Sequence, residues 1–164
     1  ELHPEDYETL AARYEACSNV KVSTVDAITA VKAALPFRER RGVVLVDPAF
    51  EVTNETEKVA LLLKQGLLRM AQTCFVIWYP VTTPRFADAF CNALTFEHAK
   101  SALRAELLVR PAGEEGGLAG SGVVVVNPPW TLYDELQGLL PALTQSLQEK
   151  QGGTSTLRWL VKPA

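Results

Sequence analysis

The stretch Gly42-Val43-Val44-Leu45-Val46-Asp47-Pro48-Ala49-Phe50 joins a short apolar run to a polar turn. A continuous run of Val and Leu of this length is typical of a strand buried in a parallel sheet. In open α/β sheets, ligands bind beyond the carboxyl ends of the strands. The tetrapeptide that follows the run is therefore the first candidate for a functional site.

Strand-like and helical segments alternate along the rest of the chain. Besides residues 42–46, the pattern predicts strands over residues 20–25, 73–79, 103–109, 122–126 and 157–161. Helical spacing and capping residues predict helices over 4–17, 26–35, 54–70, 83–94 and 132–147, the third of them opened by a capping box of Asn54 and Glu57. This alternation predicts an α/β sheet with helices on both faces.

Length and composition indicate one ordinary globular domain. The chain has 164 residues, of which 48% are hydrophobic and 21% are charged. We find no apolar run near the roughly 20 residues that span a bilayer, and we expect no membrane association. The three cysteines are widely spaced and form no CxxC pair, which argues against a zinc site or a disulfide framework and favours a reducing, cytoplasmic location.

The formal net charge of −3 is unusual for a nucleic-acid-binding protein, although a local basic patch is sufficient for binding. Arg38, Arg40 and Arg41 form a basic segment just before the 42–46 strand. These arginines are placed to contact phosphates, but a solvated charged loop explains them equally well.

Asp47-Pro48-Ala49-Phe50 resembles the (Asp/Asn/Ser)-Pro-Pro-(Tyr/Phe/Trp) motif of amino methyltransferases. An exocyclic amino group of a base is a poor nucleophile because its lone pair is delocalised into the ring. The Asp47 carboxylate and the Pro48 carbonyl can accept hydrogen bonds from its N–H groups and stabilise the developing positive charge. Phe50 can stack on a base that has left its helix. A common Asp-Pro turn at the end of a strand is the alternative interpretation.

Asn127-Pro128-Pro129-Trp130 matches the same motif more literally. Two such motifs cannot both hold the target base in one small domain. We favour Asp47 because the catalytic motif normally follows a strand beside the cofactor-binding half, with several strands still to come. We interpret the Asn127–Trp130 segment as a structural or substrate-side turn.

Two further acidic residues are candidates for binding a cofactor. Glu1 suits a role at ribose hydroxyls, as an acidic residue does in dinucleotide-binding folds. Asp26 suits the adenine amino group of a cofactor, with the Ala27 backbone beside it. A solvated terminal Glu and a plain N-cap Asp are the alternatives. His3 and His98 have no spacing that suggests a metal site or a nucleophile dyad, so we predict no metal.

Several segments together resemble one family, the bacterial 23S rRNA adenine-N6 methyltransferases of the J type. The matching segments, which keep their order from the first residue to the last, are Glu1-Leu2-His3-Pro4 with Asp6-Tyr7, Asp26, Arg40-Arg41-Gly42, Leu45-Val46-Asp47-Pro48 with Phe50-Glu51, Trp78-Tyr79-Pro80-Val81, Ser121-Gly122 and Val126-Asn127-Pro128-Pro129-Trp130. Ala49 and Phe50 depart from the family pattern, which has Pro and Tyr there.

This resemblance implies a Rossmann-like class I methyltransferase fold with S-adenosylmethionine as the methyl donor and N6 of an adenine in 23S rRNA as the target. It implies Asp47, Pro48 and Phe50 as the catalytic centre, and Glu1, Asp26, Ala27 and Asp47 as cofactor contacts. We expect a monomer that acts on protein-free or partly assembled rRNA.

Residues 1–164 are expected to be the C-terminal part of one catalytic domain, without its N-terminal strand and Gly-rich cofactor loop, so the activity is assigned to the full-length protein. An inactive RNA-binding module of the same fold and an amino methyltransferase acting on DNA stay open as alternatives.

Overall fold

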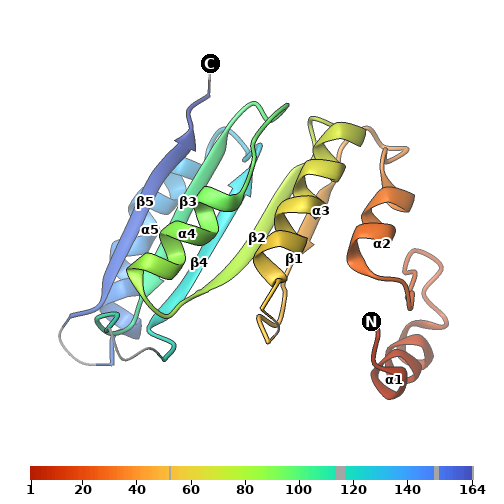
Figure 1. The fold of residues 1–164 in the computed structure, drawn as a ribbon, viewed down its shortest axis with the longest axis horizontal. Coiled ribbons are helices and arrows are strands. Elements are labelled where there is room, and N and C mark those ends of the chain that lie inside the picture. Colours follow the sequence, from red (N-terminus) through yellow and green to blue (C-terminus); the bar gives the residue numbers. More distant parts are fainter. Residues whose placement is uncertain (52, 114–116, 150–151, 164) are drawn as a thin grey trace.

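One mixed sheet with helices on both faces forms the molecule in a computed structural model that describes residues 1–51, 53–113, 117–149 and 152–163 (Figure 1). The strands are β1 (Val43–Val46), β2 (Cys74–Val81), β3 (Ala102–Leu108), β4 (Gly120–Val126) and β5 (Thr154–Val161). The helices are α1 (Pro4–Tyr14), α2 (Ala27–Ala34), α3 (Glu55–Arg69), α4 (Pro84–Ala93) and α5 (Leu132–Leu147). No helix within these ranges is both long enough and apolar enough to cross a membrane.

The strand order is β1-β2-β4-β3-β5. β1 and β2 are parallel, whereas β4 is antiparallel to both β2 and β3, and β5 is antiparallel to β3. It follows that β1, β2 and β3 run in one direction, and β4 and β5 run in the other. The carboxyl ends of the strands are therefore divided between two opposite edges of the sheet.

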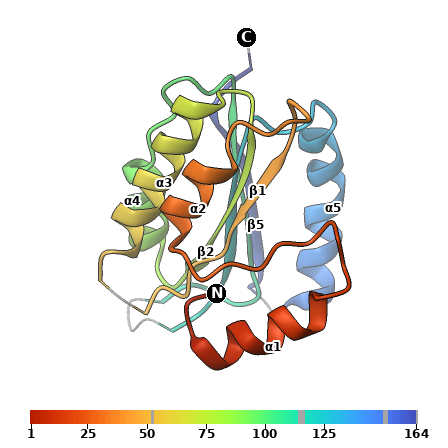
Figure 2. The ribbon, with the colours of Figure 1, turned by 90° about the vertical axis from the view of Figure 1, so that its right-hand side faces the viewer.

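The main core lies between the sheet and the layer of α3 and α4. Alternate residues of β2 are buried against this layer, and Phe75 packs where a Cβ atom on Gly66 of α3 would come within 2.4 Å of its ring. α4 begins as predicted, because the Thr83 hydroxyl accepts a hydrogen bond from the backbone N of Phe86 at 3.1 Å. α5 covers β3 and β5 on the opposite face and buries Leu140 (Figure 2).

A polar network lies inside this core, beneath α4. The Tyr79 hydroxyl donates to Glu106 Oε1 at 2.9 Å, and the same oxygen accepts from Arg104 Nη2 at 2.7 Å. Arg104 also pairs with Asp88 of α4, which Arg158 of β5 reaches at 3.2 Å. Burial raises the pKa of the Tyr79 phenol, which keeps it a donor, and the hydrogen bond from Arg104 lowers the pKa of Asp88. Each buried charge thus has a partner, as burial of charge requires.

Three sequence predictions are corrected by the structure. Residues 20–25 form no strand, because a strand needs a neighbour for its backbone groups and no described strand lies on the outer side of β1. For the same reason β1 is an edge strand rather than a buried one, and the side chains of Val43 and Leu45 are 65% and 69% exposed. Asn54 does precede α3, but its side chain makes no capping hydrogen bond.

The spacing of apolar residues over 83–94 predicts an inner face of Phe86, Phe90, Ala93 and Leu94, and the structure agrees with this only in part. Phe90 and Leu94 are buried and Phe86 is half-buried, but Ala93 faces solvent, and Ala87 and Cys91 take the remaining buried positions. Helix α4 thus faces the sheet with Ala87, Phe90 and Cys91, and the ring of Phe90 stacks on Tyr79 at a centroid distance of 4.7 Å.

We expect Gly122→Ala to lower the free energy of unfolding by about 1–3 kcal/mol, as overpacking does. Gly122 lies between Tyr79 and Glu106 in the sheet register, and a Cβ atom there would come within 2.2 Å of Tyr79 Cζ. Gly138→Ala is the control: nothing lies within 4 Å of that position on α5, so the helix should gain up to about 1 kcal/mol. Urea denaturation measures both. Equal stability of the two variants would contradict this role of Gly122.

Candidate functional site

The tetrapeptide Asp47–Phe50 directly follows β1, at the edge where β1 and β2 end. Asp47 is exposed and Pro48 is half-buried. Phe50 has a φ of 55°, in the left-handed region that bulky residues rarely adopt. This conformation turns the Phe50 ring toward β2 and α4. Trp78-Tyr79-Pro80 lies within β2, which continues to Val81, beyond the strand end predicted at residue 79.

Aromatic contacts hold Phe50 in place. Its ring centroid lies 6.0 Å from that of Trp78, 6.0 Å from that of Phe86 and 5.6 Å from that of Phe90, always in an edge-to-face arrangement. Such pairs restrict the orientation of a ring beyond what burial alone does. Phe50 nevertheless stays only half-buried, so part of the ring faces outward.

One cavity of about 540 Å³ opens beside the tetrapeptide, between β1, α2 and α3. This volume lies in the range of small-molecule sites. Three of the predicted cofactor contacts, Asp26, Ala27 and Asp47, line it together with Pro48. The rest of the lining is Leu2, Ile28, Ala30, Val31, Val44, Leu45, Val46, Glu55, Lys58, Val59 and Leu62, which is mostly apolar.

Asp26 has a local structural role as well as a place in this cavity. Its Oδ1 accepts a hydrogen bond from the backbone N of Thr29 at 3.0 Å, which caps α2. Hydrogen bonding with the side chain of Thr29, and then with its backbone N–H, lowers the pKa of the carboxyl group. A carboxylate has a second oxygen, so one capping bond leaves Asp26 able to accept another from a ligand.

Glu1 is not among the residues that line the cavity, although its neighbour Leu2 is. The Glu1 carboxylate accepts from the backbone N of His3 at 2.8 Å, and this hydrogen bond lowers its pKa. Its amino group donates to the carbonyl of Ser23 at 2.9 Å. The structure thus brings Asp26, Ala27 and Asp47 together and leaves Glu1 at their margin.

A second cavity, of about 320 Å³, lies on the other side of the tetrapeptide. It is lined by Phe50, Glu51, Thr53, Glu55, Thr56, Pro80, Thr82 and Phe86. Glu55, at the start of α3, lines both cavities. The tetrapeptide therefore forms part of the wall between them, with Asp47 and Pro48 on one side and Phe50 on the other.

Asn127 lies at the opposite edge of the sheet, because β4 runs antiparallel to β2 and ends where β2 begins. Its Nδ2 donates to the carbonyls of Ala71 and Thr73 at 2.8 and 2.9 Å, and its Oδ1 accepts from the backbone N of Lys100 at 2.8 Å. With a φ of 51°, Asn127 forms the structural turn that the sequence suggested. It cannot share a target base with Asp47.

Comparison with known proteins identifies the family. A family model described as "Ribosomal RNA large subunit methyltransferase D, RlmJ" matches residues 1–161. The chain belongs to the RlmJ family. It is 37% identical over 160 residues to ribosomal RNA large subunit methyltransferase J of Haemophilus influenzae and 32% identical over 161 residues to the Escherichia coli protein of that name.

The match covers 98% of this chain but only 57% and 58% of those RlmJ proteins. The crystal structure of protein LPL1258 from Legionella pneumophila has the same fold, with a TM-score of 0.83 and 26% identity over 96% of this chain and 58% of that one. The fold is thus that of a class I-like methyltransferase, as predicted.

The sequence analysis missed several residues that line the two cavities. Glu55, Lys58, Thr82 and Phe86 line the cavities but stand in no motif. The Thr83-Pro84 helix start was a usable signal for Phe86, because it aims the first turn of α4 at the end of β2. In the part of the chain that the structure describes, no three His, Cys, Asp or Glu side chains gather as a metal site would require.

We expect Asp26→Ala to lower the midpoint temperature of thermal unfolding, because α2 loses its N-cap. Asp26→Asn should keep most of this stability, since Asn caps helices as well as Asp does. Thermal unfolding of the two variants measures the difference. If both lose the same stability, the negative charge of Asp26, rather than its hydrogen bond to Thr29, holds the start of α2.

Proposed function

We propose that the full-length protein containing this chain transfers a methyl group from S-adenosylmethionine to N6 of an adenine in 23S rRNA. The observation that carries the proposal is the position of the tetrapeptide between two cavities, with Asp47 and Pro48 lining the larger one and Phe50 lining the smaller one. A methyl transfer needs a donor on one side of the acceptor-binding group and a base on the other, and family membership supports this reaction.

The cavity of about 540 Å³ is the candidate donor site. Its apolar wall suits an adenine ring, and Asp26 with the Ala27 backbone would hold the polar edge of that ring. The cofactor would supply a sulfonium-bound methyl group, which is transferred to a nucleophile. The side chains of this chain bind and orient it, and Lys58 and Glu55 provide charged groups at the rim.

On the acceptor side, the Asp47 carboxylate and the Pro48 carbonyl would each accept a hydrogen bond from the N6 amino group. These bonds pull the nitrogen lone pair out of conjugation and stabilise the positive charge that develops as the N–C bond forms. The exposed side chain of Asp47 and the fixed φ of Pro48 suit this arrangement. Asp47 thus both binds the base and favours the transition state.

The smaller cavity is the candidate base site, with Phe50 as the stacking surface. The contacts to Trp78, Phe86 and Phe90 hold the Phe50 ring before a base arrives, so little conformational entropy is lost on binding. The adenine must leave its helical stack to enter, as in other enzymes that modify bases.

Asp47→Ala in the full-length protein should reduce methyl transfer to unmodified 23S rRNA at least about a hundredfold, the scale of losing a group that stabilises transition-state charge. Tritiated methyl incorporation measures this rate, and mass spectrometry of the digested RNA should show N6-methyladenosine. Glu57→Gln is the matched control, because that carboxylate is exposed on α3 and lines neither cavity.

An unchanged rate for Asp47→Ala would refute the proposed mechanism. Methylation of another base, or of DNA in preference to RNA, would refute the proposed substrate while leaving Asp47 in its role.

Filling the donor cavity should weaken cofactor binding. We expect Ala30→Phe to reduce the affinity of the full-length protein for S-adenosylmethionine at least about tenfold, because Ala30 lines the cavity. Ala33→Phe tests the same substitution on an exposed position of α2 outside the cavity, and should leave the affinity unchanged. Isothermal titration calorimetry measures both. RNA binding without any binding of S-adenosylmethionine by the unsubstituted protein would instead favour a noncatalytic RNA-binding module.

A further inference from the structure

We propose that the edge of the sheet opposite Asp47 is a second RNA-binding surface, which holds a single-stranded segment away from the target adenine. This basic edge consists of Arg38, Arg40, Arg41, Lys100, Lys162 and Trp130. Its cations would contact phosphates, and the indole of Trp130 would stack on a base. The proposal rests on the proposed function, which makes RNA the substrate.

Trp130 is the first observation. Its side chain is 91% exposed, an unusual state for a large aromatic residue. The turn that carries it is rigid: Asn127 is held by three hydrogen bonds from its side chain, and Pro128 and Pro129 follow. The indole is thus presented to solvent by an ordered backbone. An aromatic side chain in that state suits stacking with a nucleobase.

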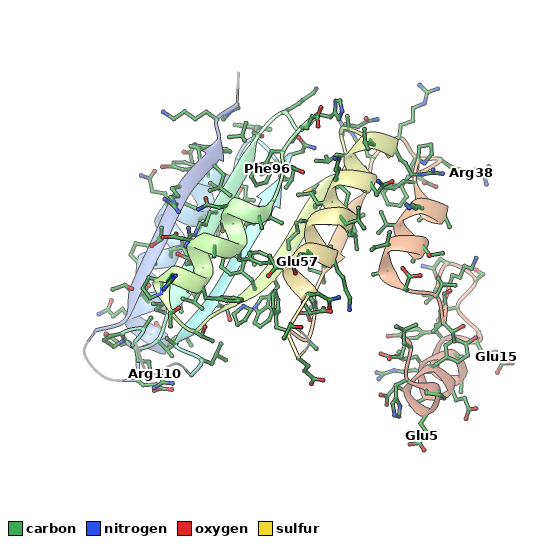
Figure 3. The ribbon with its side chains drawn as sticks, viewed as in Figure 1. Glu5, Glu15, Arg38, Glu57, Phe96 and Arg110 are labelled. Carbon is green, nitrogen blue, oxygen red and sulfur yellow. The ribbon has the colours of Figure 1, made fainter. Side chains whose placement is uncertain are left out.

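The topology brings the cations to the same edge. Lys100 precedes β3, and its backbone N is bonded to Asn127 of the tryptophan turn at 2.8 Å. Lys162 directly follows β5, whose last residue pairs with the first residue of β3. Arg41 precedes β1, which starts beside the start of β2. Figure 3 shows Arg38 at this end of the molecule and Arg110 at the other end.

The balance of acidic and basic side chains differs between the two edges. All five cations of the basic edge are exposed, while the acidic side chains near them are Glu39, Glu97, and Asp134 and Glu135 in the first turn of α5. The edge at the catalytic motif carries the acidic residues Asp26, Asp47, Glu51 and Glu55 and fewer cations, among them Lys58 and Arg110. In a chain of net charge −3, electrostatic affinity for RNA has to come from a local concentration of cations.

The two edges are separated by the length of β2. At about 3.3 Å per residue, a strand from Cys74 to Val81 spans roughly 25 Å. RNA that reaches both edges must therefore extend several nucleotides beyond the target adenine. The basic edge should contribute to the affinity for RNA without touching the reacting atoms.

The test measures binding of a fluorescent oligouridylate of about 20 nucleotides to the full-length protein by anisotropy. The double substitution Lys100→Glu with Lys162→Glu should weaken binding roughly tenfold and make the salt dependence shallower, because phosphate contacts are lost. Trp130→Ala should weaken binding to a similar extent, and Trp130→Phe should retain most of the affinity. Arg13→Glu on the distant helix α1, which reverses one surface charge, is the control and should have little effect (Figure 1).

The rate of methyl transfer at saturating 23S rRNA should stay unchanged in these variants. Wild-type affinity in the lysine and Trp130 variants, or a loss no greater than that of Arg13→Glu, would overturn the proposal. Thermal unfolding checks that the substituted proteins fold, as the exposure of all three side chains leads us to expect. If the unsubstituted protein methylates no RNA, the proposed function fails, while an affinity loss confined to the basic edge would still support this surface.

Discussion

The hydrogen bond from Tyr79 across β4 to Glu106 is the contact on which the rest of this architecture depends. It exists because Gly122 leaves room between the two side chains, and a Cβ atom there would come within 2.2 Å of the phenol ring. Glu106 in turn neutralises Arg104, which reaches α4 through Asp88. The ring of Phe90 on α4 stacks on Tyr79 and contacts Phe50. A network in the core thereby positions the aromatic wall of the candidate site.

The antiparallel direction of β4 determines where the two similar motifs lie. In an all-parallel sheet every strand would end at one edge, and two similar motifs would compete for one site. Because β4 is antiparallel to β2, the Asn127–Trp130 turn and Asp47 lie at opposite edges. The molecule thus places the two cavities at one edge and the exposed side chain of Trp130 at the other. The tetrapeptide Asp47–Phe50 is thus available for catalysis, and the Asn127–Trp130 turn is available for a structural role and for binding contacts.

Local signals predicted the elements whose stability is local. The Asp26 and Thr83 caps define helix starts through hydrogen bonds to residues three positions along. The residues of β2 alternate between buried and half-buried, as a strand covered on one face does. Prediction failed for residues 20–25, where Val and Thr have strand propensity but the segment has no described neighbouring strand. It also failed for the capping box of Asn54 and Glu57, since the Asn54 side chain makes no capping hydrogen bond. Strand formation depends on a partner that no local pattern contains.

The sequence by itself determined the family, the alternation of strands and helices, and the candidate role of Asp47, because these rest on residue type and order along the chain. Only the tertiary structure decided that Asn127 lies far from Asp47, that Asp26 shares a cavity with Asp47 while Glu1 does not line it, and that Phe50 is held by three other rings. Distances between segments remote in sequence follow from strand direction and core packing. Those properties arise when the whole sheet assembles, and no single stretch of residues encodes them.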